Sequence, residues 1–224
     1  MLSDLNSTIT DDTQTSSVIK KGKFIVFEGL DGSGKTTQIS LLQAKLEASG
    51  KKVYSTAEPT NSATGGLIRD ALSNNYKREP SELAGLFLID RISHNVNPVW
   101  GIQKFLNEGY DVICDRYYYS SFAYQGMQTD LKWIMDMNLN CPDILKPDIC
   151  IFLDIDSKMC KQRIDRERAH LEIYEKDEGT MQKIRKQFFE VFKLLKQIEN
   201  IHIVDANRPI SVVSDEIYKL VVSK

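Results

Sequence analysis

The segment from Gly29 to Thr36, GLDGSGKT, matches the pattern G-x-x-x-x-G-K-[ST]. It follows the apolar run FIVF and opens a stretch with helical periodicity, so it lies where a strand turns into a helix. Glycines let backbone N–H groups surround a phosphate, and the helix N-terminus and the lysine add positive charge. The competing interpretation is a glycine-rich turn with a solvated lysine. The flanking elements favour a phosphate-binding loop made of Gly29, Leu30, Asp31, Gly32, Ser33, Gly34, Lys35, Thr36 and Thr37.

Strand-length apolar runs alternate with helical patterns along the chain, which predicts an α/β fold with a mostly parallel sheet. The run at 148–154 is apolar on both alternating sets, as in a strand buried on both faces, and belongs in the middle of the sheet. Ligand crevices in such sheets lie beyond the carboxyl ends of the strands. We expect strands at 23–28, 52–56, 111–114, 148–154 and 201–205, and helices at 35–49, 63–74, 81–107, 158–168, 180–198 and 209–222.

With 224 residues, the chain has the size of one domain, and we assign 21–224 to it. Residues 1–20 are rich in Ser, Thr and Asp and predict a disordered tail without a secretory or mitochondrial leader, which favours a cytoplasmic location. The net charge of −2 gives no overall field toward nucleic acid or an anionic membrane. No apolar stretch approaches the roughly 18 residues of a membrane span.

A phosphate loop alone leaves hydrolase, kinase, switch and motor open. No N-K-x-D motif for guanine is visible, which counts against a GTPase. The segment 115–126, DRYYYSSFAYQG, packs an acid, an arginine and four tyrosines behind a buried strand. Arg116 there could hold a second phosphate opposite the loop. Phe87 and Arg91 are four residues apart on one helix face, where a ring can stack on a base and a guanidinium can reach its edge.

Together, FEGLDGSGKTT, LFLIDR at 86–91 and DRYYYSSFAYQG resemble the motifs of bacterial-type thymidylate kinases, over roughly 23–222. The resemblance implies a three-layer P-loop kinase fold with a central five-stranded sheet. It also implies transfer of the γ-phosphate of ATP to dTMP, with Mg²⁺ as cofactor. Members of the family are usually homodimers packed through helices, and the apolar segment 81–107 could take part.

The resemblance also assigns roles in the dTMP site. Phe87 stacks on thymine, Arg91 hydrogen-bonds the base carbonyl, and Ser121 and Gln125 line the same pocket. Arg69 and Arg116 bind the acceptor phosphate, Asp31 accepts from the 3′-hydroxyl, and Tyr124 crowds the place of a 2′-hydroxyl. Glu58 also belongs to the dTMP site, although Ala57, Thr60 and Asn61 replace family residues in the same loop. Thr36 and Asp115 would bind magnesium. No general base is needed, because the attacking phosphate oxygen is already ionised at neutral pH.

Arginines at 163, 166 and 168 precede a polar segment that predicts a lid over 163–179. Because loop position 32 is Gly, the family pattern places the catalytic arginine in this lid, as Arg163, Arg166 or Arg168. A solvated basic helix would look similar. Arg208, after the last expected strand, resembles the family residue that lies against adenine. The histidines show no ligand spacing and receive no chemistry. The remaining alternatives are a kinase for another nucleoside monophosphate or a deoxynucleoside, and a non-catalytic nucleotide-binding module.

Overall fold

The computed structural model describes residues 20–167, 172–174 and 177–223. Within these residues one sheet has the strand order β2-β3-β1-β4-β5, and every neighbouring pair is parallel. The predicted α/β class and five-stranded sheet are confirmed. The strands are β1 (Phe24–Gly29), β2 (Lys52–Ala57), β3 (Tyr110–Asp115), β4 (Ile149–Asp154) and β5 (Ile201–Asp205).

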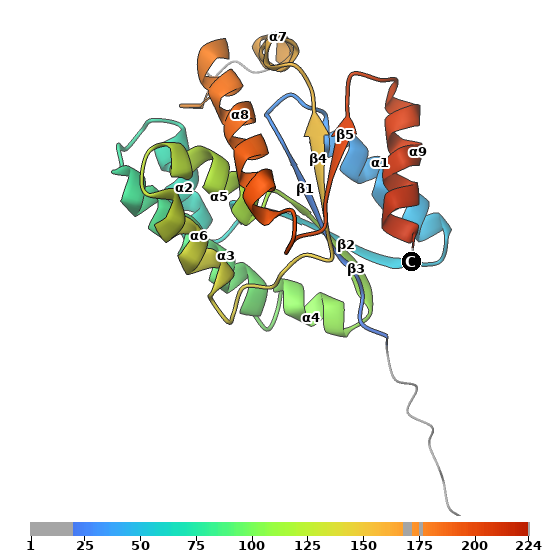
Figure 1. The fold of residues 1–224 in the computed structure, drawn as a ribbon. Coiled ribbons are helices and arrows are strands. Elements are labelled where there is room, and N and C mark those ends of the chain that lie inside the picture. Colours follow the sequence, from blue (N-terminus) through green and yellow to red (C-terminus); the bar gives the residue numbers. More distant parts are fainter. Residues whose placement is uncertain (1–19, 168–171, 175–176, 224) are drawn as a thin grey trace, which may run out of the picture.

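Helices cover both faces of the sheet (Figure 1). On one face lie α1 (Lys35–Ala48) and α9 (Ile210–Val222); on the other lie α2 (Ala63–Leu72), α3 (Pro80–Val96), α5 (Tyr118–Tyr124), α6 (Leu131–Leu139) and α8 (Glu178–Leu195). The helix α7 (Ser157–Glu167) sits above the carboxyl end of β4, and α4 (Ile102–Asn107) lies near the opposite end of the sheet (Figure 1). Among the described residues, no helix combines the length and apolar character that a bilayer crossing requires.

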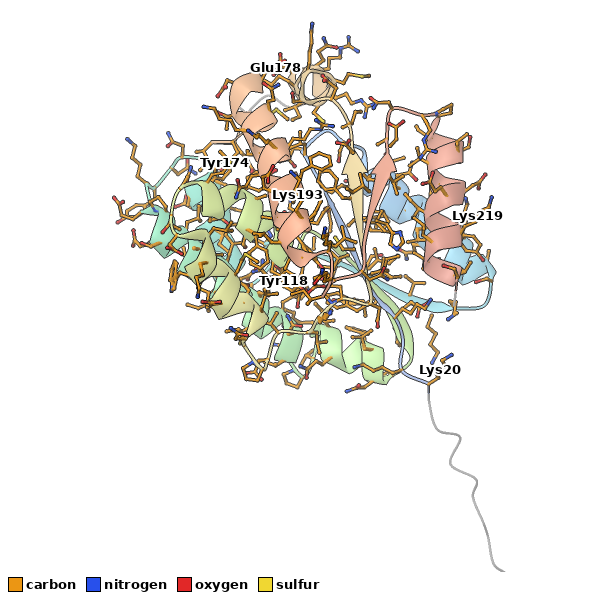
Figure 2. All side chains as sticks on the ribbon, in the orientation of Figure 1. Lys20, Tyr118, Tyr174, Glu178, Lys193 and Lys219 are labelled. Atoms are coloured by element: carbon orange, nitrogen blue, oxygen red, sulfur yellow. The ribbon has the colours of Figure 1, made fainter. Side chains whose placement is uncertain are left out.

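Two apolar cores flank the sheet, because successive side chains of a strand point to opposite faces. Phe24 and Val26 of β1 join the core beneath α5 and α8, whereas Ile25 and Phe27 join the core beneath α1 and α9. Side chains fill both layers (Figure 2). The strand β4 is buried on both faces, as predicted, and is an interior strand between β1 and β5. The central position of the five belongs to β1.

The prediction of a single helix over 81–107 is wrong. The chain leaves α3 after Val96 and starts α4 only at Ile102. Pro98 is the physical reason, because a proline disfavours helical backbone at the residue before it, and Asn97 is extended with ψ 126°. The Oδ1 atom of Asn97 then accepts from the backbone N–H groups of Val99 and Trp100 and holds the turn.

Two helices, α5 and α6, were not predicted. All seven residues of α5 are buried, so it lacks the polar face that produces helical periodicity in a sequence. Its N-terminus has no side-chain cap of its own. Instead, Glu28 at the end of β1 accepts from the backbone N–H groups of Tyr117 and Ser120. Burial raises the pKa of Glu28, which these hydrogen bonds and the nearby Arg116 only partly offset.

Candidate active site

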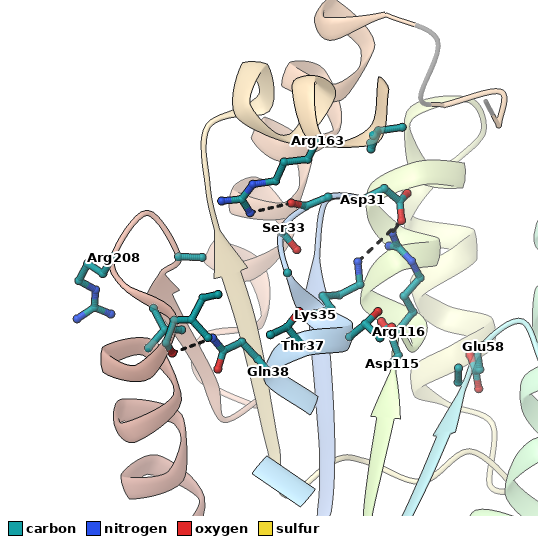
Figure 3. Close-up of a pocket in the computed structure, with 18 residues that line it drawn as sticks. Asp31, Ser33, Lys35, Thr37, Gln38, Glu58, Asp115, Arg116, Arg163 and Arg208 are labelled. Carbon is teal, nitrogen blue, oxygen red and sulfur yellow. Dashed lines mark hydrogen bonds and ion pairs between the residues drawn. The ribbon is translucent and has the colours of Figure 1, made fainter. Parts of the chain in front are cut away.

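The phosphate loop joins β1 to α1 with backbone donors free to meet an anion. Gly34 caps α1 in the left-handed region at φ 95°, and no side chain caps the first turn. A helix N-terminus left open in this way binds phosphate. Lys35 is buried, and its Nζ donates to the carbonyls of Gly29 and Leu30. The loop from Asp31 to Thr37 lines a cavity of about 540 Å³ (Figure 3), whereas the Leu30 side chain belongs to the core.

Position 32 is closed to any side chain by the first turns of α7. A Cβ on Gly32, which has φ 75°, would lie 2.7 Å from the carbonyl oxygen of Cys160. In its place, Arg163 reaches over the loop and donates from Nη1 to the Gly32 carbonyl at 3.0 Å (Figure 3). Arg166 is exposed and does not line the cavity, and Arg168 lies outside the described residues. Of the two arginines that the structure describes here, Arg163 is therefore the one that reaches the phosphate loop.

Two oxygen-bearing residues in the same cavity fit a magnesium ion. Thr36 and Asp115 both line it. The Oδ1 atom of Asp115 is buried and has no hydrogen-bond partner among the described residues. Hydroxyl and carboxylate oxygens are the ligands that Mg²⁺ prefers, and it usually takes few of them from the protein beside substrate phosphates.

A second cavity of about 280 Å³ adjoins the first and is enclosed by α2, α3 and α5. Phe87 and Arg91 both line it, as the spacing of four residues predicted. Its walls also include Arg69, Arg116, Tyr124 and Gln125. Ser121 does not line this cavity; it stands behind it and accepts from Arg91 Nη2 at 3.2 Å.

The guanidinium of Arg91 is fixed from three elements and is 1% exposed. Glu58, directly after β2, accepts from Nε at 2.8 Å and also lies 2.7 Å from Nη2. Asn138 of α6 accepts from Nη1 at 2.6 Å. A buried charge held by partners from three elements keeps its geometry, because each lost contact leaves an unpaired polar group.

Arg116 links the two cavities and lines both. Its backbone has φ 67°, which is uncommon for a residue with a side chain, and it turns the chain from β3 into α5. Nη2 donates to Asp31 at 2.8 Å, Nη1 donates to Ser120 at 2.9 Å, and the guanidinium lies 5.2 Å from the centre of the Tyr124 ring. Burial alone would lower the pKa of Arg116, but Asp31, Tyr124 and nearby acids raise it well above its usual range.

The loop after β2, in which Thr60 departs from the family motif, is held in place by hydrogen bonds to α3. Asp90, which is buried beside Arg91, accepts from the backbone N–H and the hydroxyl of Thr60 and from the hydroxyls of Ser62 and Thr64. Burial would raise the pKa of Asp90, but these hydrogen bonds outweigh it and lower the pKa below its ordinary value. Arg69 donates to the carbonyl of Thr60 at 2.6 Å.

Sequence reasoning missed Tyr174, in the segment predicted as a polar lid. The Ile173 N–H donates to the carbonyl of Leu72 at the end of α2. Tyr174 is buried, lines the second cavity and packs edge-on against Tyr124 with ring centres 5.0 Å apart. Charged residues at 172, 175 and 176 made the segment read as polar and hid this burial.

The far end of the first cavity is formed by the loop between β5 and α9. Ala206 and Arg208 of this loop line the cavity, as does Ile210 at the start of α9; Figure 3 labels Arg208. Arg208 donates from Nη2 to Glu216 of α9, so its side chain is held beside the cavity. This is the place where the sequence predicted contact with adenine.

Comparison with known proteins decides the family. The family model for thymidylate kinase matches residues 27–217. The chain belongs to the thymidylate kinase family. It is 38% identical over 207 residues to a probable thymidylate kinase of Pyrococcus horikoshii, covering 90% of this chain and 96% of that one. It is 34% identical over 200 residues to a thymidylate kinase of Thermosipho melanesiensis, covering 88% and 96%.

A solved structure gives the same family. The thymidylate kinase of Candida albicans aligns with a TM-score of 0.75 and 26% identity over 90% of this chain and 91% of that chain. The family predicted from the motifs is therefore confirmed, together with its fold and its kinase activity.

Proposed function

We propose that this protein transfers the γ-phosphate of ATP to dTMP, with the phosphate-loop cavity as the donor site and the second cavity as the acceptor site. The observation that carries the proposal is the shared wall of the two cavities: Asp31, Ala57, Glu58 and Arg116 line both. Two phosphates bound on either side of that wall would face each other, as direct transfer requires.

On the donor side, the open N-terminus of α1 binds the β- and γ-phosphates, and Lys35 releases the loop carbonyls to pair with them. The triphosphate would lead along the cavity to Arg208 and Ala206, which receive the adenine. Arg163 stands over the loop and stabilises charge on the transferred phosphoryl group. The closed position 32 supports this role, because α7 leaves no room for a basic side chain there.

On the acceptor side, Phe87 stacks on thymine and Arg91 donates to its 4-carbonyl. Arg116 and Arg69 hold the monophosphate, Asp31 accepts from the 3′-hydroxyl, and Tyr124 occupies the space of a 2′-hydroxyl. A phosphate oxygen is already anionic at neutral pH, so it attacks the γ-phosphorus without a general base as the ADP oxygen leaves.

Thr36 and Asp115 would hold magnesium in this proposal. When bound, the ion would supply positive charge beside the phosphates of ATP. Asp115 Oδ1, which has no hydrogen-bond partner within the described part of the chain, supports the assignment, because a buried carboxylate oxygen without a donor is otherwise costly.

Steady-state phosphorylation of dTMP, dUMP, dCMP, AMP and thymidine, each with ATP, tests the proposal. We expect dTMP to give the highest kcat/KM. A higher value for AMP, dCMP or thymidine would replace the proposed acceptor, and no phosphorylation of any of them would favour a non-catalytic nucleotide-binding module.

We also propose a homodimer formed through α3. Ile89 and Val96 lie seven residues apart on one face of this helix, with 54% and 42% of their surfaces exposed, and Val99 beyond its end is 71% exposed. Light scattering should give twice the mass of the chain, and Ile89→Glu should shift it toward the monomer. A monomeric wild type would contradict this proposal.

The four cysteines are all free thiols, which supports a cytosolic location.

A further inference from the structure

We propose that His94, completed by Thr56, is a positioning residue that acts through Glu58 to aim Arg91 at the pyrimidine base. The inference rests on the proposed role of Arg91 in recognising the base. It assigns a task to a buried histidine for which the sequence offered none.

The contacts form one unbroken chain from β2 to the base cavity. His94 lies on α3, three residues after Arg91, and its side chain is fully buried. Its Nδ1 is 3.0 Å from Glu58 Oε1, and its Nε2 is 2.7 Å from Thr56 Oγ1. The other oxygen of Glu58 is the one that accepts from Arg91 Nε.

These partners assign the two ring nitrogens different roles. Glu58 already accepts from Arg91, so its carboxylate acts as an acceptor, and Nδ1 must carry the hydrogen that it donates. In a neutral ring Nε2 is then the acceptor, and the Thr56 hydroxyl supplies its donor. Each ring nitrogen therefore has a hydrogen-bond partner, and the two contacts fix the ring orientation.

The consequence falls on Arg91 because one carboxylate carries both contacts. With Oε1 held by His94, Glu58 cannot rotate, and Oε2 stays on the guanidinium. Glu58, His94 and Arg91 are all at most 4% exposed, so a polar group that loses its partner here has little access to solvent. A guanidinium fixed in this way offers only donors, which suits a 4-oxo pyrimidine and opposes the 4-amino group of cytosine.

Thr56→Val removes the hydroxyl that contacts His94 with little disturbance of the fold, because valine is isosteric with threonine and suits a strand. We expect the KM for dTMP to rise about tenfold and the preference for dTMP over dCMP to fall by a similar factor. The KM for ATP should stay within about twofold, as expected for a charge that is displaced only at the base. Thr56→Ser should restore wild-type values. Ser55→Ala is the control, since Ser55 is exposed on the same strand and bonds Gln43 instead.

His94→Asn and His94→Phe give an independent comparison. The asparagine amide can still place an N–H near Glu58, so it should retain more of the dTMP preference than phenylalanine does. The inference is overturned if Thr56→Val leaves both the KM for dTMP and the preference over dCMP unchanged, or if the KM values for dTMP and ATP rise together. Arg91→Lys distinguishes a failure of the Arg91 assignment from a failure of the His94 inference. An unchanged KM for dTMP in Arg91→Lys refutes the role of Arg91 itself. A raised KM in Arg91→Lys, with no change in Thr56→Val, refutes only the positioning role of His94 and Thr56.

Discussion

Arg116 Nη2 lies 2.8 Å from Asp31 Oδ1, and this ion pair joins the segment that opens the acceptor helix α5 to the phosphate loop. The guanidinium is further held by Ser120 and by the face of Tyr124. One arginine thus stands at the boundary of both cavities, with its geometry set from the donor and the acceptor sides.

Arg116→Ala should lower kcat/KM for dTMP by about 100-fold or more, because a charged donor on the reacting phosphate is lost. ATP binding, measured by titration calorimetry, should persist, since the open end of α1 and Lys35 are untouched. Lys132→Ala, on the exposed surface of α6, serves as the control. An unchanged rate with dTMP would remove Arg116 from the acceptor site.

Arg163→Ala should lower kcat by about 100-fold with a small change in the KM for dTMP, since Arg163 contacts the phosphate loop and not the acceptor cavity. Arg166→Ala should have a much smaller effect, because that side chain is exposed on α7. Lys158→Ala on the same helix controls for loss of positive charge. If Arg166→Ala proves the more damaging change in rapid-quench measurements, the assignment of the lid arginine is wrong.

Tyr124→Ala should weaken the preference for dTMP over its ribose counterpart, ribothymidine monophosphate. The ring is locked between Arg116 and Tyr174, so it cannot swing away from a 2′-hydroxyl. Tyr124→Phe keeps the ring and should keep the preference. We expect the ratio of the two kcat/KM values to fall about tenfold for the alanine variant alone. Equal ratios for all three proteins would show that sugar selection lies elsewhere.

Asp90→Asn should reduce the acid sensitivity of the fold. The pKa of Asp90 is lowered in the folded protein, so its ionised form contributes stability above its unfolded pKa of about 3.9. That contribution is lost as the pH falls through this value toward the folded pKa. In denaturant unfolding, the wild type should lose more stability than the variant between about pH 5 and pH 3. Parallel curves for the two proteins would contradict the role of Asp90 as the anchor of Thr60, Ser62 and Thr64.

Local patterns sufficed wherever structure and chemistry depend on neighbours in sequence. The glycines and Lys35 follow a strand directly, and Phe87 and Arg91 share a helix face, so local spacing sufficed to select residues that line the two adjoining cavities. Pro98 was also visible, and the break that it causes between α3 and α4 could have been predicted from its effect on Asn97.

Long-range contacts could not be predicted in the same way. His94 meets Thr56 across 38 residues, and Glu58 meets Arg91 across 33, so neither pair leaves a spacing to recognise. Tyr174 is buried by elements that come from elsewhere in the chain. The helix α5 was hidden by its complete burial, which removed the alternation of polar and apolar residues.

A crystal structure of the protein with dTMP bound tests the central claim most directly. The account predicts thymine stacked on Phe87 with its 4-carbonyl at Arg91, the monophosphate at Arg116, and the 3′-hydroxyl at Asp31. Density for dTMP outside the cavity lined by Phe87 and Arg116, or a monophosphate that points away from the phosphate loop, would contradict it.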